Sequence, residues 1–267
     1  MDFKKGDYVT RFSYNSDVIF KIEKIEDGKA ILRGSRLRLL ADAPLDDLKK
    51  YDTSQKEIKK DLQLESLRCL KRRRRNLILN KTRCNNSNGA ENKFRKQVGE
   101  VLHIDGDRDY LQLSLQNYEN LLIPARGFFV PEKVQPVKIR SFLESFNPDI
   151  LVITGHDGVT GNDFNTADYF IKTVKIARDY VPDLDQLIIF AGACYSPYKK
   201  LIQEGANFAS SPRNQLLHFL DPVLVVEKVA YTSIRKVVSV KDILKTLITE
   251  KGVGGIETRG KMRRCYP

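Results

Sequence analysis

His156 and Cys194 each follow an apolar segment and stand beside small residues, which makes them the side chains best suited to covalent chemistry. His156 lies in the sequence Thr-Gly-His-Asp-Gly at 154–158, and Cys194 lies in Ala-Gly-Ala-Cys-Tyr-Ser at 191–196. A deprotonated cysteine is a strong nucleophile, and a histidine can protonate a leaving amine near neutral pH. The pair therefore predicts cleavage of a peptide bond through a thioester.

The glycines beside this pair predict where a substrate and its developing negative charge would lie. Gly155 and Gly158 would let a substrate backbone approach His156. The backbone N–H groups of Gly158 and Cys194 are candidates for an oxyanion hole. A single cysteine after a strand is usually a buried apolar residue, and a single histidine in a turn usually only makes hydrogen bonds. The occurrence of both at equivalent positions favours the catalytic interpretation.

The elements that must position these residues begin after residue 96, where apolar strands alternate with helices. Such a pattern predicts a mostly parallel α/β sheet with helices on both faces, whose functional residues gather at the carboxyl ends of its strands. Consecutive strands often lie about 4.8 Å apart, so His156 and Cys194 should face one substrate. We predict strands at 98–104, 126–130, 149–154, 187–191 and 206–209, and helices at 108–122, 137–146, 166–180, 197–204 and 237–249.

Three regions are predicted along the chain. Residues 1–52 carry short alternating apolar segments with an Asp-Gly turn at 27–28, which indicates a small SH3-like β-barrel. Residues 53–96 read as a basic amphipathic helix followed by a flexible, Asn-rich linker. Residues 97–267 form the α/β domain that carries His156 and Cys194.

Composition limits the classes of protein that the chain can belong to. With 267 residues, 41% hydrophobic and 30% charged, it suits a globular protein with two domains. No apolar run is as long as a membrane span, and the start lacks the apolar core of a secretory signal, so we expect a cytoplasmic protein. Four cysteines without a C-x-x-C spacing and three histidines indicate neither a disulfide scaffold nor a structural metal, and no cofactor is expected.

Two other functions remain as alternatives. The net charge of +12 is concentrated in residues 55–100, which hold 14 Lys or Arg and 5 Asp or Glu, so the barrel and this basic segment could bind RNA or an acidic protein. No aromatic-rich basic strand is evident, which makes nucleic acid the less favoured partner. Asp105 and Asp107 could instead be the D-x-D pair of a magnesium phosphatase, although no phosphate-binding glycine loop accompanies them.

The placement of histidine and cysteine at consecutive strand ends resembles the caspase-like peptidases, such as clostripain, legumain and gingipain. Those families usually place glycine directly after the histidine, whereas here Asp157 intervenes before Gly158. Longer motifs in the same order resemble the YabG family of sporulation-specific peptidases. These motifs are Lys5-Gly6-Asp7 and the segments 41–45, 102–107, 153–157, 190–194, 205–212 and 254–260.

This resemblance implies a caspase-like fold and a cysteine endopeptidase with His156 and Cys194 as its catalytic pair. It also implies a mother-cell protein that processes spore coat and cortex-associated proteins and becomes associated with the developing coat. Related peptidases often cut after basic residues, so Asp105 or Asp107 would hold the basic side chain, unless both are only solvated turn carboxylates. Further residues predicted to bind the substrate main chain are Asn207, Ser210 and Ser211.

Cleavage after basic residues would make one segment of the chain a substrate of its own active site. The tract Arg72, Arg73, Arg74 and Arg75 lies on the predicted flexible connection, so the enzyme is expected to cut it and separate barrel from peptidase domain. The ordinary alternative is that these charges form a solvated helix face.

Overall fold

Residues 8–50 form an antiparallel five-stranded sheet in a computed structural model that describes residues 2–86, 95–158 and 166–265. The strands occur in the order β4-β3-β2-β1-β5, with β4 and β5 at the two ends of the order, so closure into a barrel stays a prediction. Asp27 and Gly28 both have positive φ and join β2 to β3, as predicted for a tight hairpin. The strands are β1 Tyr8–Arg11, β2 Phe20–Glu26, β3 Lys29–Gly34, β4 Leu40–Pro44 and β5 Leu48–Lys50, with 3₁₀ turns η1 Phe12–Tyr14 and η2 Leu45–Asp47.

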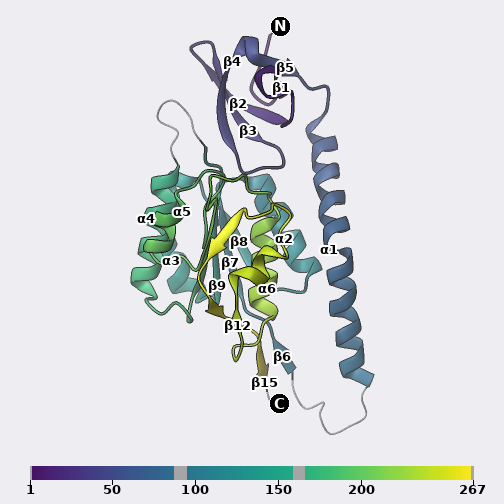
Figure 1. Cartoon of the computed structure of the whole chain (residues 1–267), viewed down its shortest axis with the longest axis vertical. Coiled ribbons are helices and arrows are strands. Elements are labelled where there is room, and N and C mark those ends of the chain that lie inside the picture. Colours follow the sequence, from purple (N-terminus) through teal and green to yellow (C-terminus); the bar gives the residue numbers. More distant parts are fainter. Residues whose placement is uncertain (1, 87–94, 159–165, 266–267) are drawn as a thin grey trace.

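A single long helix, α1 (Gln55–Asn86), follows this sheet and runs along one side of the molecule (Figure 1). Its buried Ile58 and Leu62 pack in one cluster with Tyr8 of β1 and with Tyr110 and Leu113, and Leu70 joins the core of the second sheet. The helix extends through the arginine tract, so the tract does not lie on a flexible connection. Most of the predicted linker lies outside the described residues.

The second sheet has six strands in the order β13-β11-β10-β9-β7-β8, and all neighbouring pairs except β11–β13 are parallel. This confirms the predicted mostly parallel sheet. The strands are β7 Val101–Asp105, β8 Ala125–Phe129, β9 Ile150–Thr154, β10 Ile188–Ala191, β11 Phe208–Ser210 and β13 Val253–Gly255.

Helices cover both faces of the second sheet, as predicted. Because side chains alternate along a strand, Ile150 and Val152 pack under α1, α2 and α6, whereas Leu151 and Ile153 pack under α3, α4 and α5 (Figure 1). The helices are α2 Arg108–Asn120, α3 Gln135–Phe146 after η3 Glu132–Val134, α4 Ala167–Tyr180, α5 Tyr198–Gln203 and α6 Asp221–Tyr231. Within the described ranges, no helix has the length and apolar character needed to cross a membrane.

The C-terminal part differs from the prediction of one helix over 237–249. The segment instead begins with β12 (Val237–Val238), which pairs with β14 (Thr258–Arg259), and Ser239 then caps the short α7 (Val240–Leu244). The buried α6, which the sequence pattern did not predict, supplies the apolar layer in its place. A final pair, β6 (Arg95–Gln97) and β15 (Arg263–Cys265), lies beside the C-terminus.

Candidate active site

The loops that carry His156 and Cys194 come together at one edge of the second sheet. β9 and β10 are hydrogen-bonded neighbours, with Ile153 opposite Ala191, so the two loops leave adjacent strands. Both loops donate to the same atom, the carbonyl oxygen of Arg38, which lies between β3 and β4. The N–H of Cys194 lies 3.1 Å from this oxygen and the N–H of Asp157 lies 3.3 Å from it.

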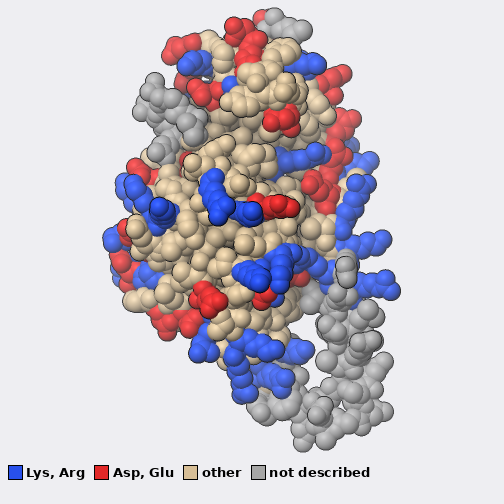
Figure 2. Space-filling view, in the orientation of Figure 1, with Lys and Arg blue, Asp and Glu red and all other residues tan. Residues whose placement is uncertain are grey.

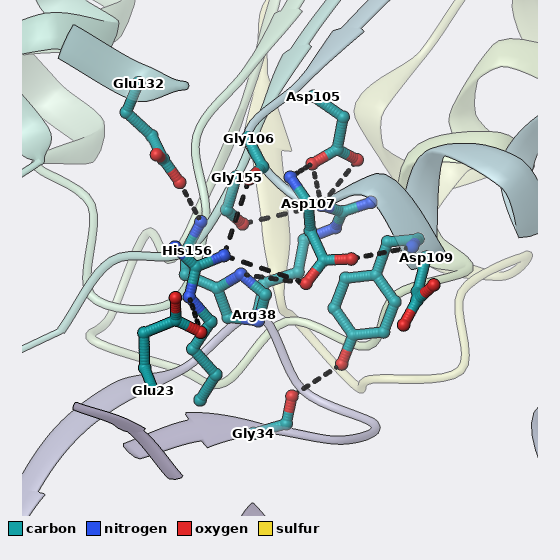
Figure 3. Close-up of polar contacts among 12 residues, drawn as sticks. Glu23, Gly34, Arg38, Asp105, Gly106, Asp107, Asp109, Glu132, Gly155 and His156 are labelled. Carbon is teal, nitrogen blue, oxygen red and sulfur yellow. Dashed lines mark hydrogen bonds and ion pairs between the residues drawn. The ribbon is translucent and has the colours of Figure 1, made fainter. Parts of the chain in front are cut away.

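His156 is buried, with 1% of its surface exposed. Its Nδ1 lies 3.7 Å from Oδ2 of Asp107, and its ring stacks on that of Tyr110 with centroids 5.3 Å apart (Figure 3). Neither ring nitrogen has a hydrogen-bond partner among the described residues. Burial, followed by the nearby charges of Arg33 and Arg38, holds the pKa of His156 well below its ordinary value, so the imidazole is neutral at pH 7.

Cys194 is fully buried in the apolar core beneath α6. Its Sγ accepts a hydrogen bond from the N–H of Leu217 at 3.1 Å. Burial raises the pKa of the Cys194 thiol to about 12, although the main chain of Leu217 lowers it in part. The resting pair therefore consists of a neutral thiol and a neutral imidazole.

Asp157 joins the loop that carries His156 to the loop that carries Cys194. Its Oδ1 accepts from the N–H of Gly158 and from Oγ1 of Thr166, both at 3.0 Å, and its Oδ2 accepts from Oγ of Ser196 at 2.9 Å. That Ser196 hydroxyl in turn accepts from the N–H of Ala193 at 2.9 Å. The N–H of Gly158, which was the predicted oxyanion donor, therefore bonds to the side chain of Asp157. The N–H groups that donate to the Arg38 carbonyl are those of Cys194 and Asp157.

A buried carboxylate, Glu132, fixes the loop of His156 and was not anticipated from the sequence. Its Oε1 accepts from the N–H of His156 at 3.0 Å (Figure 3). A methyl group on Gly106 would meet this carboxylate at 2.2 Å, and one on Gly155 would meet it at 2.4 Å. Both glycines are required here because Glu132 lies directly against their backbone.

Asp105 forms a fully buried ion pair with Arg38. Nη1 of Arg38 lies 2.9 Å from Oδ2 and 3.2 Å from Oδ1 of Asp105, and neither side chain is exposed (Figure 3). Thr154 donates to the same carboxylate at 2.9 Å, and the guanidinium lies over the ring of Tyr110. Although burial alone would raise it, the Arg38 guanidinium, His103 and the N–H of Asp107 hold the pKa of Asp105 well below its ordinary value.

Asp107, the second predicted acidic residue, caps α2 and faces the imidazole. Its Oδ1 accepts from the N–H of Tyr110 at 2.9 Å, while its Oδ2 faces His156 and lies 3.9 Å from Arg33. Burial and the neighbouring charge of Asp105 raise the pKa of Asp107. Neither aspartate is a solvated turn carboxylate. Asp105 pairs with Arg38, whereas Asp107 faces His156 and Arg33.

The main chain around Arg38 is extended and lies between residues 217–219 and the loop of His156. The N–H of Arg38 donates to the carbonyl of Leu217 at 3.0 Å, and the N–H of Phe219 donates to the carbonyl of Arg36 at 3.2 Å. Beyond Arg38, the N–H of Leu40 donates to the carbonyl of Asp157 at 2.9 Å. Residues 36–40, which we call the connecting segment, thus pair with residues 217–219 on one side and with the His156 loop on the other.

The remaining predicted binding residues lie in different places. Asn207 precedes β11 at the opposite end of the strand, and its amide bonds to Leu184 and Ile189, so the structure does not bring it to this edge. Ser210 ends β11, and its hydroxyl supports the Cys194 loop by donating to the carbonyl of Ala193 at 2.7 Å. The hydroxyl of Ser211 donates to the carbonyl of Gln215 at 3.0 Å.

The arginine tract lies away from the site, in the middle of α1. Arg73 forms an ion pair with Glu227 of α6, and Arg74 bonds to Asn120 of α2. Figure 2 shows Lys and Arg along this part of α1 and near the C-terminal strand pair, with Asp and Glu frequent on upper α1 and the first sheet. Among the described residues, no group of three His, Cys, Asp or Glu is placed to hold a metal ion.

Comparison with known proteins identifies the family of this chain. A family model described as YabG peptidase U57 matches residues 4–267. The chain belongs to the YabG peptidase family. It is 39% identical over 294 aligned positions to the sporulation-specific protease YabG of Bacillus subtilis (strain 168), covering 100% of this chain and 99% of that protein. Membership in the YabG family makes the chain a sporulation-associated peptidase. No solved structure matches it significantly, so a caspase-like fold stays a prediction.

Proposed function

We propose that this chain is a cysteine endopeptidase that cuts after basic residues, with Cys194 as nucleophile and His156 as proton donor. The observation that supports this most directly is the position of Arg38. Its carbonyl oxygen accepts from the N–H groups of Cys194 and Asp157, while its guanidinium pairs with buried Asp105. An arginine before a scissile bond would need this combination, because its carbonyl develops negative charge and its side chain needs a counter-charge.

The reaction follows from these groups, which together with residues 217–219 form what we call the substrate site. His156 accepts the proton of the Cys194 thiol, the resulting thiolate attacks the carbonyl carbon, and the N–H groups of Cys194 and Asp157 stabilise the oxyanion. When the C–N bond breaks, His156 gives its proton to the departing amine and leaves a thioester. Water then loses a proton to His156 and hydrolyses the thioester, which releases an acid and restores the thiol. Asp107, facing Nδ1, orients the ring and stabilises the imidazolium.

The substrate backbone would bind as an added strand. The edge at residues 217–219 offers the carbonyl of Leu217 and the N–H of Phe219, which the connecting segment uses. Strand addition supplies affinity through the main chain, so sequence preference rests on the side chain that meets Asp105. This favours arginine over lysine, since a buried carboxylate suits the planar fork of a guanidinium.

The biological substrates proposed for the chain are spore coat and cortex-associated proteins. The sporulation-specific name of the Bacillus subtilis relative supports a role in spore formation. The enzyme would act in the mother cell and become associated with the developing coat, where unfolded basic segments would be available.

Digestion of a denatured protein rich in basic residues tests this proposal. Wild type, Cys194→Ala, Cys194→Ser and His156→Ala are incubated with it to completion, and the new termini are identified by mass spectrometry. We expect wild type to cut after arginine and the alanine variants to leave the protein intact. Equal cutting by all four would refute the catalytic pair, whereas cuts without a basic residue would refute only the role of Asp105.

A further inference from the structure

The connecting segment lies in the substrate site in the orientation that a substrate would take. Two main-chain hydrogen bonds place residues 36–38 as an antiparallel strand on residues 217–219, and Leu37 pairs with His218. The carbonyl of Arg38 is held by the two N–H groups assigned to the oxyanion hole. The bond that follows this carbonyl, Arg38–Leu39, therefore occupies the position of a scissile bond.

The residues after Arg38 continue along the site on the far side of this bond. Leu39 pairs in parallel with Asp157, and the N–H of Leu40 donates to the Asp157 carbonyl. A methyl group on Gly158 would meet the carbonyl oxygen of Leu40 at 1.7 Å, so the two backbones are in direct contact. The chain is thus bound on both sides of the Arg38–Leu39 bond.

Burial of the charged Arg38 side chain costs free energy that a purely structural turn between β3 and β4 would not need to spend. Its side chain is fully buried, yet Nε and Nη2 have no hydrogen-bond partner among the described residues. Replacing a buried ion pair with apolar side chains is often neutral or stabilising. A role of the Asp105 contact in recognition accounts for an arginine at this position.

The segment also closes the site to other polypeptides. With it in place His156 is 1% exposed and Cys194 is 0% exposed, although both belong to a peptidase. A second chain cannot form the hydrogen bonds to Leu217, Phe219 and Asp157 while residues 36–40 hold them. The described form is therefore closed to external substrates.

We propose, on the basis of the proposed function, that the enzyme is made in a self-blocked form and that its first substrate is its own Arg38–Leu39 bond. Cys194 gives its thiol proton to His156 and attacks the Arg38 carbonyl carbon, the C–N bond to Leu39 breaks, and His156 passes that proton to the new amine. Hydrolysis of the thioester by one water leaves a carboxylate on Arg38 and a free amino terminus on Leu39. The two new charged ends are costly to bury, which drives them out and opens the site.

This site differs from the arginine tract expected from the sequence. Residues 72–75 lie within α1, whose backbone rises only about 1.5 Å per residue and has its carbonyls bonded internally. A substrate strand must be extended and offer free main-chain groups, as residues 36–40 do. The tract would have to unwind before it could be cut, whereas Arg38 is already bound.

Purified full-length chain tests the inference when self-cleavage and cleavage of an arginyl fluorogenic peptide are followed together. Wild type should yield a fragment that begins at Leu39, and peptide cleavage should show a lag that ends as this fragment forms. The rate constant should not change over a tenfold range of protein concentration, because the bond is cut within one molecule. Cys194→Ala should stay intact.

Matched variants separate recognition from folding. Arg38→Gln should form the Leu39 fragment at least about 100-fold more slowly, because a buried charge loses its partner. Arg38→Lys should restore cutting in part, and Arg75→Gln, which changes an exposed arginine of the tract, should behave as wild type. If Arg38→Gln does not fold, as judged by its thermal unfolding, Arg38→Lys and the wild-type fragment decide the question.

The outcomes distinguish this inference from the proposed function. Wild type that cuts the arginyl peptide without a lag and without a Leu39 fragment overturns the self-blocked form and leaves the peptidase standing. A rate constant that rises with protein concentration overturns the intramolecular step. A wild type that cuts neither the peptide nor itself overturns the proposed function as well.

Discussion

Replacing Asp105 by asparagine should remove recognition of the basic residue and leave the catalytic groups in place. The carboxylate and the Arg38 guanidinium are both fully buried, with Nη1 and Oδ2 2.9 Å apart. At an effective dielectric constant of about 20, two unit charges at this distance attract by about 6 kcal/mol before desolvation is subtracted. Asparagine keeps the size of the side chain and an oxygen that can accept from Thr154.

The expected loss is that of a buried charge left without its partner, about 3–5 kcal/mol. In kcat/KM for an arginyl peptide this corresponds to a decrease of about a hundred- to a few-thousand-fold. The assay compares Asp105→Asn with wild type, after the lag has ended, on two peptides that differ only by arginine or citrulline before the cut. Citrulline has nearly the same shape without the charge, so Asp105→Asn should change its already slow cleavage little.

A nearby carboxylate provides the control for this experiment. Asp109→Asn makes the same chemical change four residues away, where the carboxylate pairs with Lys59 at the surface, so its effect should stay within a few-fold. Equal losses on the arginine and citrulline peptides would show that Asp105 supports the fold or the catalytic loops. That result would refute its role in recognition.

Other perturbations address the main chain, the rim and the thiol. Gly158→Ala should displace the connecting segment, because its methyl group would meet the Leu40 carbonyl, and should slow formation of the Leu39-starting fragment; an unchanged rate would contradict the close contact. Arg36 lies two positions before Arg38, and its side chain lies 3.6 Å from Glu65, with both partly exposed. Glu65→Gln should therefore weaken a preference for substrates with a basic residue two positions before the cleaved arginine, by less than about fivefold. A short iodoacetamide pulse at pH 8 should label Cys194 about a thousandfold more slowly in the freshly purified chain than in urea, because a pKa of about 12 leaves little thiolate, and labelling should rise with pH. Equal labelling would contradict the buried neutral thiol.

That the loops of His156 and Cys194 leave adjacent strands could be predicted because it depends on local patterns and one general rule of sheet topology. Apolar strands at 150–154 and 188–191 separated by a helix pattern indicate parallel neighbours, and functional residues gather at their carboxyl ends. His156 and Cys194 follow from this without knowledge of any contact between them. Acidic residues after β7 are brought to the same edge by the same rule.

The contacts proposed to give the site its specificity could not be predicted because they join segments far apart in the sequence. Arg38 lies 67 positions from Asp105 and 156 from Cys194, and in the sequence it is one basic residue of a short alternating run. Glu132 and Asp107 contact the His156 loop only once the sheet has formed. The C-terminal region was predicted wrongly because Val237–Val238 finds a strand partner, which outweighs its helical spacing.

The first sheet and the connecting segment do more to His156 and Cys194, the proposed catalytic pair, than cover them. This argues that the first sheet restrains the enzyme rather than recruits substrates. Arg33 on β3 and Arg38 place positive charge beside His156, and burial beneath the connecting segment adds to the effect, so the imidazolium is disfavoured. The same burial disfavours the Cys194 thiolate. Release of the segment would remove the charge of Arg38 and admit water, which raises the pKa of the imidazole and lowers that of the thiol. Release of the segment would then open the site and favour the Cys194 thiolate in one step, because the segment that blocks substrates also keeps the nucleophile protonated.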